Sequence, residues 1–268
     1  MISAKIVSAD EIFFDIRFFR TINKHQYFRG QAESRSLRLA GINRFMDKQN
    51  VPVITLDGPS ASGKGTIARL VSKALGFHYL DSGALYRLVA LAAMKHSVDA
   101  SDENSMVDIA RHLNASFRDS SVWLDEEDVS NEVRAEACGE YASRIAQYPA
   151  LRVELLGCQR DFRKLPGLVT DGRDMGSVIF PDATLKIYLT ATEEERALRR
   201  HKQLMEKGIN ASIADLIQAL RARDERDSSR VASPLQQCED ANLLDTTGLS
   251  IDQVVSRVLS LYAEAQKA

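Results

Sequence analysis

The stretch Gly58-Pro59-Ser60-Ala61-Ser62-Gly63-Lys64-Gly65-Thr66 decides how the rest of this 268-residue chain is interpreted. It follows a short apolar run, Val51–Leu56, and opens a segment, Lys64–Leu75, whose apolar residues recur at helical spacing. A glycine-rich turn between a strand and a helix can direct its backbone N–H groups inward, and the helix start adds a partial positive charge. The pattern therefore predicts a loop that binds nucleotide phosphates, with Lys64 reaching the β- and γ-phosphates.

Predicted strands and helices alternate along most of the chain beyond this loop. The predicted strands are Val51–Leu56, Phe77–Leu80, Leu168–Thr170, Leu185–Leu189 and Leu243–Leu244, the last of them expected to be buried. The predicted helices are Lys64–Leu75, Ala84–Lys95, Glu193–Glu206, Ile213–Arg226 and Ile251–Ala265. Such alternation predicts an α/β fold in which helices cover both faces of a parallel sheet.

One stretch interrupts the alternation and indicates a second, smaller part of the molecule. Ala115–Phe117 and Val122–Leu124 predict a hairpin of short antiparallel strands, and helical segments follow it as far as Lys164. We therefore expect residues 51–268 to form a domain whose core, residues 51–99 and 166–268, carries an inserted subdomain at about residues 100–165.

The first 45 residues differ from the rest of the chain. They hold aromatic–basic clusters such as Arg17-Phe18-Phe19-Arg20 without a sustained period, so they carry no clear pattern of strands or helices. We expect residues 1–50 to be a poorly ordered N-terminal extension, as would be read from an upstream start codon.

Composition excludes several classes of function. The 35 Lys and Arg residues nearly balance the 37 Asp and Glu residues, so the net charge of −2 argues against nucleic acid as a partner and is compatible with a monomer. Three widely spaced cysteines without a CxxC pair argue against zinc and disulfides and favour the reducing cytoplasm. No apolar run approaches the roughly 18 residues of a membrane helix.

Two further motifs follow predicted strands directly, where ligands bind at the sheet edge of open α/β folds. In the first, Asp81–Arg87, Ser82 stands at a helix start and Arg87 in the first turns. In the second, Leu168–Gly176, a short strand ends in Asp-Gly-Arg173-Asp174. Taken alone, each motif is also typical of an ordinary helix cap or a charged turn. Because the motif occurs in a chain with a phosphate loop, we expect the forked guanidinium of Arg173 to bind a phosphate. The carboxylate of Asp174 can accept a hydrogen bond from an exocyclic amine.

Two predicted helices carry arginine-rich faces. The residues at three- and four-residue spacing are Arg196, Arg199 and Arg200 on the first and Arg223, Asp227 and Arg230 on the second. Such faces are most often solvated surfaces. Because both follow a phosphate-binding loop in one chain, we favour helices that close over phosphates.

The motifs together resemble a known family. Gly65 stands where Ser or Thr usually follows the lysine, and this GKGT variant resembles the nucleoside monophosphate kinases among P-loop proteins. The set GPSASGKGT, LDSGALYR, GLVTDGRDMG and RARDERDSSR resembles the bacterial cytidylate kinases in order and spacing, from about Val51 to the C-terminus. The hairpin-bearing insertion also resembles the nucleoside monophosphate-binding subdomain of that family, whereas residues 1–50 have no counterpart in it.

The resemblance implies a reaction and a set of roles that composition and spacing do not establish. It implies transfer of the ATP γ-phosphoryl group to CMP or dCMP with Mg²⁺, under a helical lid at about residues 196–212. The residues that it implies for ATP binding are the loop Gly58–Thr66 together with Arg196, Arg199 and Arg200. The residues that it implies for catalysis are Lys64, Arg173 and Arg87. The residues that it implies for CMP binding are Ser82, Tyr86, Arg87, Ser143, Arg152, Arg173, Asp174, Arg223, Asp227 and Arg230. No side chain is expected to ligate Mg²⁺ directly, with Thr66 the one candidate.

Two alternatives remain open at this point. One is another P-loop small-molecule kinase that acts on UMP or a sugar acid, against which the Asp-Gly-Arg-Asp turn favours a nucleotide acceptor. The other is a nucleotide-dependent sensor that binds a nucleotide without transferring a phosphoryl group. The arginines on the acceptor side argue against it. A turnover assay separates the two.

Overall fold

The computed structural model describes residues 13–15, 51–118 and 121–267 of the chain. Apart from residues 13–15, the extension predicted at residues 1–50 lies outside these ranges. The described residues form two compact units. The first comprises Ala84–Glu154 together with the short strand β1 (Phe13–Asp15), and the second comprises residues 51–83 and 155–267.

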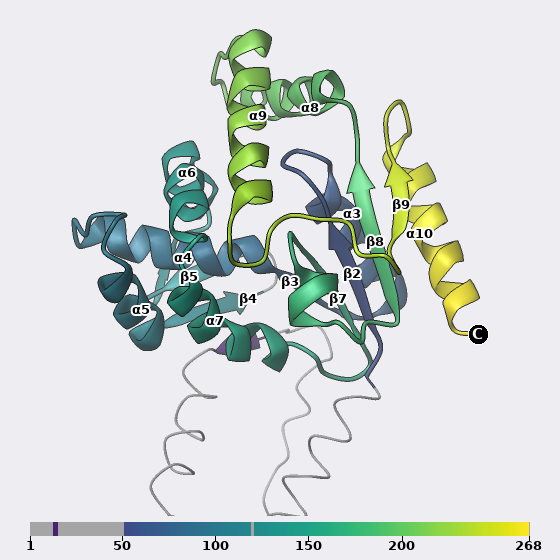
Figure 1. The fold of residues 1–268 in the computed structure, drawn as a ribbon, viewed down its shortest axis with the longest axis horizontal. Helices are drawn as coiled ribbons and strands as arrows, with labels where there is room; N and C mark the ends of the chain where they lie inside the picture. The colour runs from purple at the N-terminus through teal and green to yellow at the C-terminus, as the bar shows by residue number, and fades with distance from the viewer. Residues whose placement is uncertain (1–12, 16–50, 119–120, 268) are drawn as a thin grey trace, which may run out of the picture. The chain divides into compact units, whose positions relative to one another are not determined.

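A five-stranded parallel sheet forms the centre of the second unit (Figure 1). Its strands, in the spatial order β3-β7-β2-β8-β9, are β3 (His78–Asp81), β7 (Leu168–Gly172), β2 (Val53–Asp57), β8 (Leu185–Thr190) and β9 (Asn242–Asp245). All five predicted strands are confirmed, and each runs one or two residues past its predicted end. The parallel pairing thus continues into the polar residues that follow each apolar run, which places Asp57, Asp81 and Asp171 at one edge of the sheet.

Helices cover this sheet because its strands are apolar on both faces. On one face, Ile54 and Leu56 of β2 pack in a cluster with α3 (Lys64–Leu75) and α10 (Ile251–Ala265). On the other face, Thr55 lies beside Gly176 of the short helix η2 (Met175–Ile179), which contacts β2 and β7. The predicted parallel α/β sheet with helices on both faces is confirmed.

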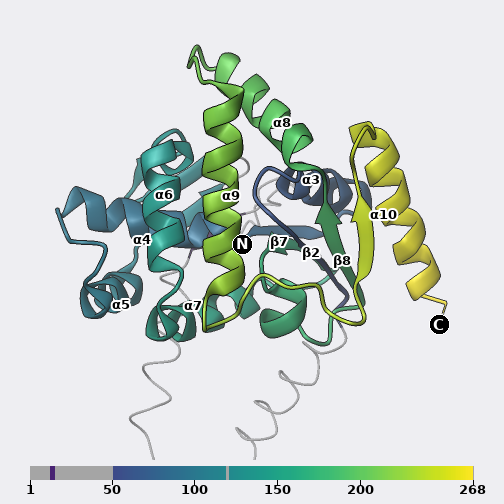
Figure 2. The same cartoon turned by 45° about the horizontal axis from the view of Figure 1, so that its top comes forward.

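The two arginine-bearing helices pack against each other in the second unit (Figure 2). They are α8 (Glu193–Met205) and α9 (Ile213–Ser229). Each begins at a hydroxyl cap, since the side chains of Thr192 and Ser212 accept from backbone N–H groups in the first turn. Throughout the described part of the chain, no helix is long and apolar enough to cross a membrane.

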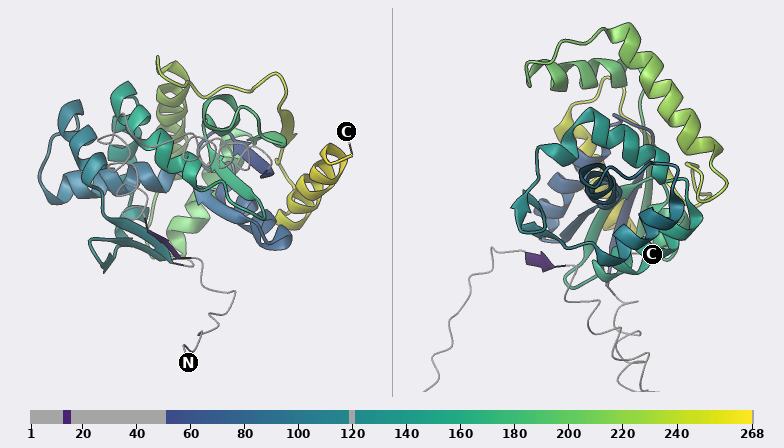
Figure 3. Two further views of the ribbon diagram at one scale, coloured as in Figure 1. Left: turned by 90° about the horizontal axis from the view of Figure 1, so that it is seen from below. Right: turned by 90° about the vertical axis from the view of Figure 1, so that its left-hand side faces the viewer.

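The first unit combines a small antiparallel sheet with helices (Figure 3). The sheet has the order β1-β4-β5-β6, in which β4 (Ala115–Arg118) and β5 (Ser121–Leu124) form the predicted hairpin and β6 is Glu127–Asp128. The helical segments are α4 (Ser82–Lys95), α5 (Glu103–His112), η1 (Glu132–Arg134), α6 (Glu136–Ile145) and α7 (Pro149–Asp161). The chain passes between the units inside α4 and α7. Strand β1 pairs with β4 and was not predicted.

The expectation that the last strand is buried is wrong. Leu243 in β9 is 59% exposed, whereas Leu244 packs against the core cluster between the sheet, α3 and α10. Strand β9 lies at the edge of the sheet and pairs only with β8 among the described strands, so only one of its faces meets the core. Two adjacent leucines were therefore read as one buried run although they point to opposite faces.

Gly58, the first residue of the phosphate loop, allows a close approach that no other residue permits. Its φ angle is +151°, and a Cβ there would lie 2.0 Å from the backbone oxygen of Leu189. We expect Gly58→Ala to lower the free energy of unfolding by roughly 3 kcal/mol or more, measured by urea unfolding, because strain and overpacking add. The matched control is Gly157→Ala in α7, where the added methyl meets nothing within 4 Å, and a gain of about 0.5–1 kcal/mol is expected. Equal stability of Gly58→Ala and wild type would contradict the close approach.

Candidate functional site

The loop between β2 and α3 folds around the side chain of its own lysine. Gly63 (φ +92°) and Ala61 (φ +58°) adopt left-handed backbone conformations, which turn the chain sharply before α3 begins at Lys64. The ammonium group of Lys64 donates to the backbone oxygen of Pro59 at 2.9 Å. The hydroxyl of Ser62 is buried and has no hydrogen-bond partner among the described residues, so it is available to a bound group. This is the geometry of a preformed anion cradle.

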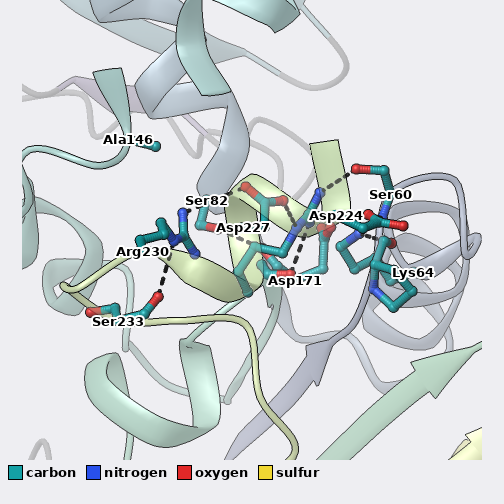
Figure 4. A network of polar contacts seen from close by, with 12 residues as sticks. Ser60, Lys64, Ser82, Ala146, Asp171, Asp224, Asp227, Arg230 and Ser233 are labelled. Carbon is teal, nitrogen blue, oxygen red and sulfur yellow. Dashed lines mark hydrogen bonds and ion pairs between the residues drawn. The ribbon is translucent and has the colours of Figure 1, made fainter. Parts of the chain in front are cut away.

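The electrostatics of the loop favour an anionic ligand. Burial lowers the pKa of Lys64, and the nearby positive charge of Arg173 lowers it further. Burial raises the pKa of Asp171 at the end of β7, and the carboxylate of Asp81 adds to that rise. Figure 4 shows Lys64 and Asp171 near each other below Ser60. Phosphate groups bound here would favour the charged form of Lys64.

Two arginines of α8 reach back to the loop. Arg196 is buried and donates to the backbone oxygen of Ser60 at 3.0 Å and to the carboxylate of Asp224. Arg199 donates to the backbone oxygen of Ser62 at 3.0 Å. Arg200 instead donates to Gln203 on its own helix at 3.2 Å. The structure therefore brings two of the three predicted arginines to the phosphate loop.

Arg173 connects the turn after β7 to the same loop. Its Nη2 donates to the hydroxyl of Ser60 at 3.0 Å, and its Nε donates to the carboxylate of Asp227 on α9 at 2.7 Å. Asp227 in turn lies 3.8 Å from Arg230, the first residue after α9, which also donates to the backbone of Ser233. Burial would raise the pKa of Asp227, but Arg173, Arg230 and then Arg223 hold it below its usual range. These predicted residues thus form one charged network.

Asp174, next to Arg173, is 4% exposed. Its carbonyl oxygen accepts from the N–H groups of Val178 at 2.9 Å and Ile179 at 3.2 Å, which form the first turn of η2. Ser82, at the start of α4, donates its hydroxyl to the backbone oxygen of Asp171 at 2.8 Å. The turn that carries the predicted base-reading carboxylate is therefore fixed from both sides.

Asp57, at the end of β2, anchors this turn from below. Its carboxylate accepts from the backbone N–H groups of Met175 at 2.9 Å and Gly176 at 2.8 Å. Burial raises the pKa of Asp57 to about 6, although these two hydrogen bonds act in the opposite direction. Sequence reasoning did not select Asp57, and the turn that it holds carries Arg173 and Asp174.

The raised pKa of Asp57 predicts a particular pH dependence of stability. Between about pH 4 and pH 6 the folded protein binds a proton that the unfolded chain releases, so ionisation of Asp57 costs stability as the pH rises. We expect the stability of wild type relative to Asp57→Asn to fall by up to about 3 kcal/mol from pH 4 to pH 7. Urea unfolding of both proteins across this range measures the difference. A difference that stays constant with pH would contradict a raised pKa.

Four predicted residues belong to the first unit and are described within it. Arg87 donates to the backbone oxygen of Val133 at 2.8 Å, and Arg152 lies over the ring of Tyr86, 5.7 Å from its centroid. Ser143 is buried, and its hydroxyl has no hydrogen-bond partner in the described part of the chain. A buried hydroxyl of this kind is expected where a ligand completes the hydrogen bonding.

Four carboxylate and hydroxyl side chains at the site were missed or left without a role. They are Asp57, Tyr79, Asp171 and Asp224. A signal existed for two of them, because Asp57 and Asp171 end neighbouring parallel strands, and the ends of such strands meet at one sheet edge. No comparable signal marks Tyr79, whose hydroxyl donates to Asp171 at 2.8 Å, or Asp224, which lies in a run of charged residues on α9.

Comparison with known proteins agrees with this geometry. Residues 54–264 match the protein family described as Cytidylate kinase. The cytidylate kinase of Nitrosomonas europaea is 90% identical over 223 residues, which are 83% of this chain and 100% of that protein. That of Nitrosomonas eutropha is 80% identical over 82% of this chain and 98% of its own length. That of Burkholderia vietnamiensis is 58% identical over 79% of this chain and 92% of its own. The phosphate loop is contacted by arginines, and the family match covers most of the chain. The chain therefore belongs to the cytidylate kinase family.

Proposed function

We propose that this protein transfers the γ-phosphoryl group of ATP to CMP and dCMP, giving ADP and the corresponding diphosphate. The observation that carries the proposal is the convergence of three arginines on the loop residues Ser60–Ser62: Arg196 and Arg199 on backbone oxygens and Arg173 on the Ser60 hydroxyl. Phosphoryl transfer requires little covalent chemistry from the protein and depends on positioning and charge stabilisation. A loop that already gathers these cations supplies both.

On the donor side, the loop and Lys64 bind the phosphates of ATP. The side-chain amino group of Lys64 exchanges its contact with the Pro59 oxygen for the β- and γ-phosphates, whose negative charge favours its charged form. Arg196 and Arg199 then stabilise the charge that develops on the transferring group, as part of a lid at about residues 196–212. Arg200, which bonds within α8, stays the weakest of the three assignments.

On the acceptor side, the proposed roles follow the chemistry of each group. Arg87 and Arg173 bind the acceptor phosphate, to which a guanidinium fork is suited. Asp174, Ser143 and Arg152 bind the cytosine edge, with the Asp174 carboxylate accepting from the amino group. The remaining assignments are Tyr86, Arg223 and Asp227 toward the acceptor sugar, Arg230 near the phosphates and Ser82 within the CMP site.

The residues beside the loop fit a magnesium ion. A Cβ at Gly65 would lie 3.6 Å and 3.7 Å from the carboxylate oxygens of Asp171, and the hydroxyl residue Thr66 follows directly. Carboxylate and hydroxyl oxygens are suitable ligands for Mg²⁺, which usually keeps several waters. We propose that Thr66 holds the ion directly or through water and Asp171 through water. When bound, Mg²⁺ would neutralise negative charge on the ATP phosphates.

Three further properties complete the proposal. The protein acts in the cytoplasm, where its substrates are found and where its three cysteines, which form no disulfide with one another, stay reduced. It acts as a monomer, with which the nearly balanced charge of the chain is compatible. Closure of the lid over both substrates excludes water and suppresses simple hydrolysis of ATP.

The experiment is a measurement of ADP release with ATP and Mg²⁺ against CMP, dCMP, UMP, AMP and no acceptor. We expect CMP and dCMP to raise turnover by at least about a hundredfold over the acceptor-free rate and well above UMP and AMP. Equal turnover without an acceptor would indicate an ATPase or a sensor and would overturn the acceptor-side roles. Preference for UMP would indicate a different nucleoside monophosphate kinase.

A further inference from the structure

Ser60, the third residue of the phosphate loop, has all three of its polar groups bound to other segments. Its backbone N–H donates to the carboxylate of Asp224 at 2.9 Å, and its backbone oxygen accepts from Arg196 at 3.0 Å. Its hydroxyl accepts from Arg173 at 3.0 Å. The residue is 5% exposed. Ser60 therefore joins an arginine on the donor side of the site to one on the acceptor side.

Asp224 closes this arrangement from helix α9. One carboxylate oxygen accepts from the N–H of Ser60, and the other accepts from the guanidinium of Arg196 (Figure 4 labels Ser60 and Asp224). The side chains of Arg196 and Asp224 are 6% and 17% exposed, so solvent screens the pair little. Arg196, Ser60 and Asp224 thus form a closed ring of hydrogen bonds.

The same helix face holds the acceptor-side arginine. Asp227, three residues after Asp224 and so on the same side of α9, accepts from Nε of Arg173 at 2.7 Å. Burial alone would lower the pKa of Arg173, but the carboxylate of Asp227 and then that of Asp224 raise it above its usual range. One face of α9 therefore orients both arginines, with Ser60 between them.

We infer that Asp224 is a positioning residue that, through Ser60, couples the arginine at the ATP phosphates to the arginine at the acceptor phosphate. This inference rests on the proposed kinase reaction. Asp224 contacts neither substrate in this role. It holds Arg196 and the loop at one relative position, so a shift of either arginine when its substrate binds is transmitted to the other through the shared contacts of Ser60.

The test is a pair of double-mutant cycles on CMP phosphorylation. Asp224→Asn keeps the shape of the side chain but removes the charge that faces Arg196. We expect it to lower kcat/KM for both ATP and CMP by about tenfold to a hundredfold. In an Arg196→Ala background the same change should cost less than about threefold, and in an Arg173→Ala background its effect should also shrink. Glu225→Gln, an exposed neighbour on α9 that loses the same charge, should change neither parameter.

A second variant separates positioning from damage to the fold. Ser60→Ala removes the hydroxyl that Arg173 contacts but keeps the N–H and oxygen that Asp224 and Arg196 use. Its loss of kcat/KM should be non-additive with Arg173→Ala, because both changes remove the same contact. It should also be non-additive with Arg196→Ala, because the Ser60 hydroxyl is the link from Arg196 to Arg173. Thermal unfolding of each variant checks that the fold persists, and if Asp224→Asn does not fold, the Ser60→Ala cycles decide alone.

The outcomes distinguish this inference from the proposed function. Losses that are additive in both cycles, or equal losses for Glu225→Gln and Asp224→Asn, would overturn the coupling and leave the kinase reaction standing. Absence of CMP-dependent turnover in the wild-type protein would overturn both proposals. Non-additivity with both arginines would support the coupling, since a general weakening of α9 would act equally in every background.

Discussion

Replacement of Lys64 by alanine is expected to lower kcat for CMP phosphorylation by about a hundredfold to a thousandfold while the protein stays folded. The ammonium group lies within the phosphate loop, 2.9 Å from the Pro59 oxygen. A charge aimed at phosphate oxygens stabilises the transition state most where water is excluded, and Lys64 is only 8% exposed.

The fold should tolerate this loss for an electrostatic reason. Burial lowers the pKa of Lys64, which means that the ligand-free protein is destabilised, not stabilised, by the charged form. Removing the charge therefore costs the free protein little, and thermal unfolding should stay near that of wild type. The matched control is Lys73→Ala, an exposed lysine on the same helix, which should keep wild-type kcat. If Lys64→Ala retains more than a tenth of wild-type kcat, the assigned role is wrong.

Much of the fold could be predicted because apolar periodicity reports local structure faithfully. The helix predicted at Lys64–Leu75 has those bounds in the structure, and the predicted hairpin is present. What periodicity does not report is depth within the sheet: Leu243 is exposed because β9 is an edge strand, and strand order depends on contacts far along the chain. The pairing of β1 with β4 joins segments about a hundred residues apart and left no signal in either.

The site residues, like the fold, divide into those marked by local sequence signals and those that depend on distant contacts. The loop and Arg173 could be selected from the sequence because glycines and strand ends mark them locally. Asp224 and Asp57 were missed because their roles come from hydrogen bonds that span 164 and 118 residues of sequence. Spacing also placed Arg200 with its neighbours, but adjacent residues on a helix differ by about 100° in direction. Arg199 thus donates to the loop, whereas Arg200 donates to Gln203 on its own helix.

Replacement of Asp174 by alanine is expected to lower kcat/KM for CMP by about tenfold to a hundredfold, with less than about a threefold change for UMP or in the KM for ATP. Cytosine presents an amino group where uracil presents a carbonyl oxygen, so only CMP loses a hydrogen bond to the carboxylate. The turn itself should persist, because its hydrogen bonds to Val178 and Ile179 come from the backbone of Asp174 and not from its side chain.

Asp174→Asn gives the sharper test, because it changes the acceptor preference instead of only removing it. The amide oxygen can still accept from the cytosine amino group, and the amide nitrogen can donate to the uracil carbonyl. We expect kcat/KM for UMP to rise and that for CMP to fall modestly, so that their ratio moves toward one. Initial rates with each acceptor at saturating ATP measure this. Equal losses for CMP and UMP in both variants would mean that Asp174 supports the turn and does not bind the base.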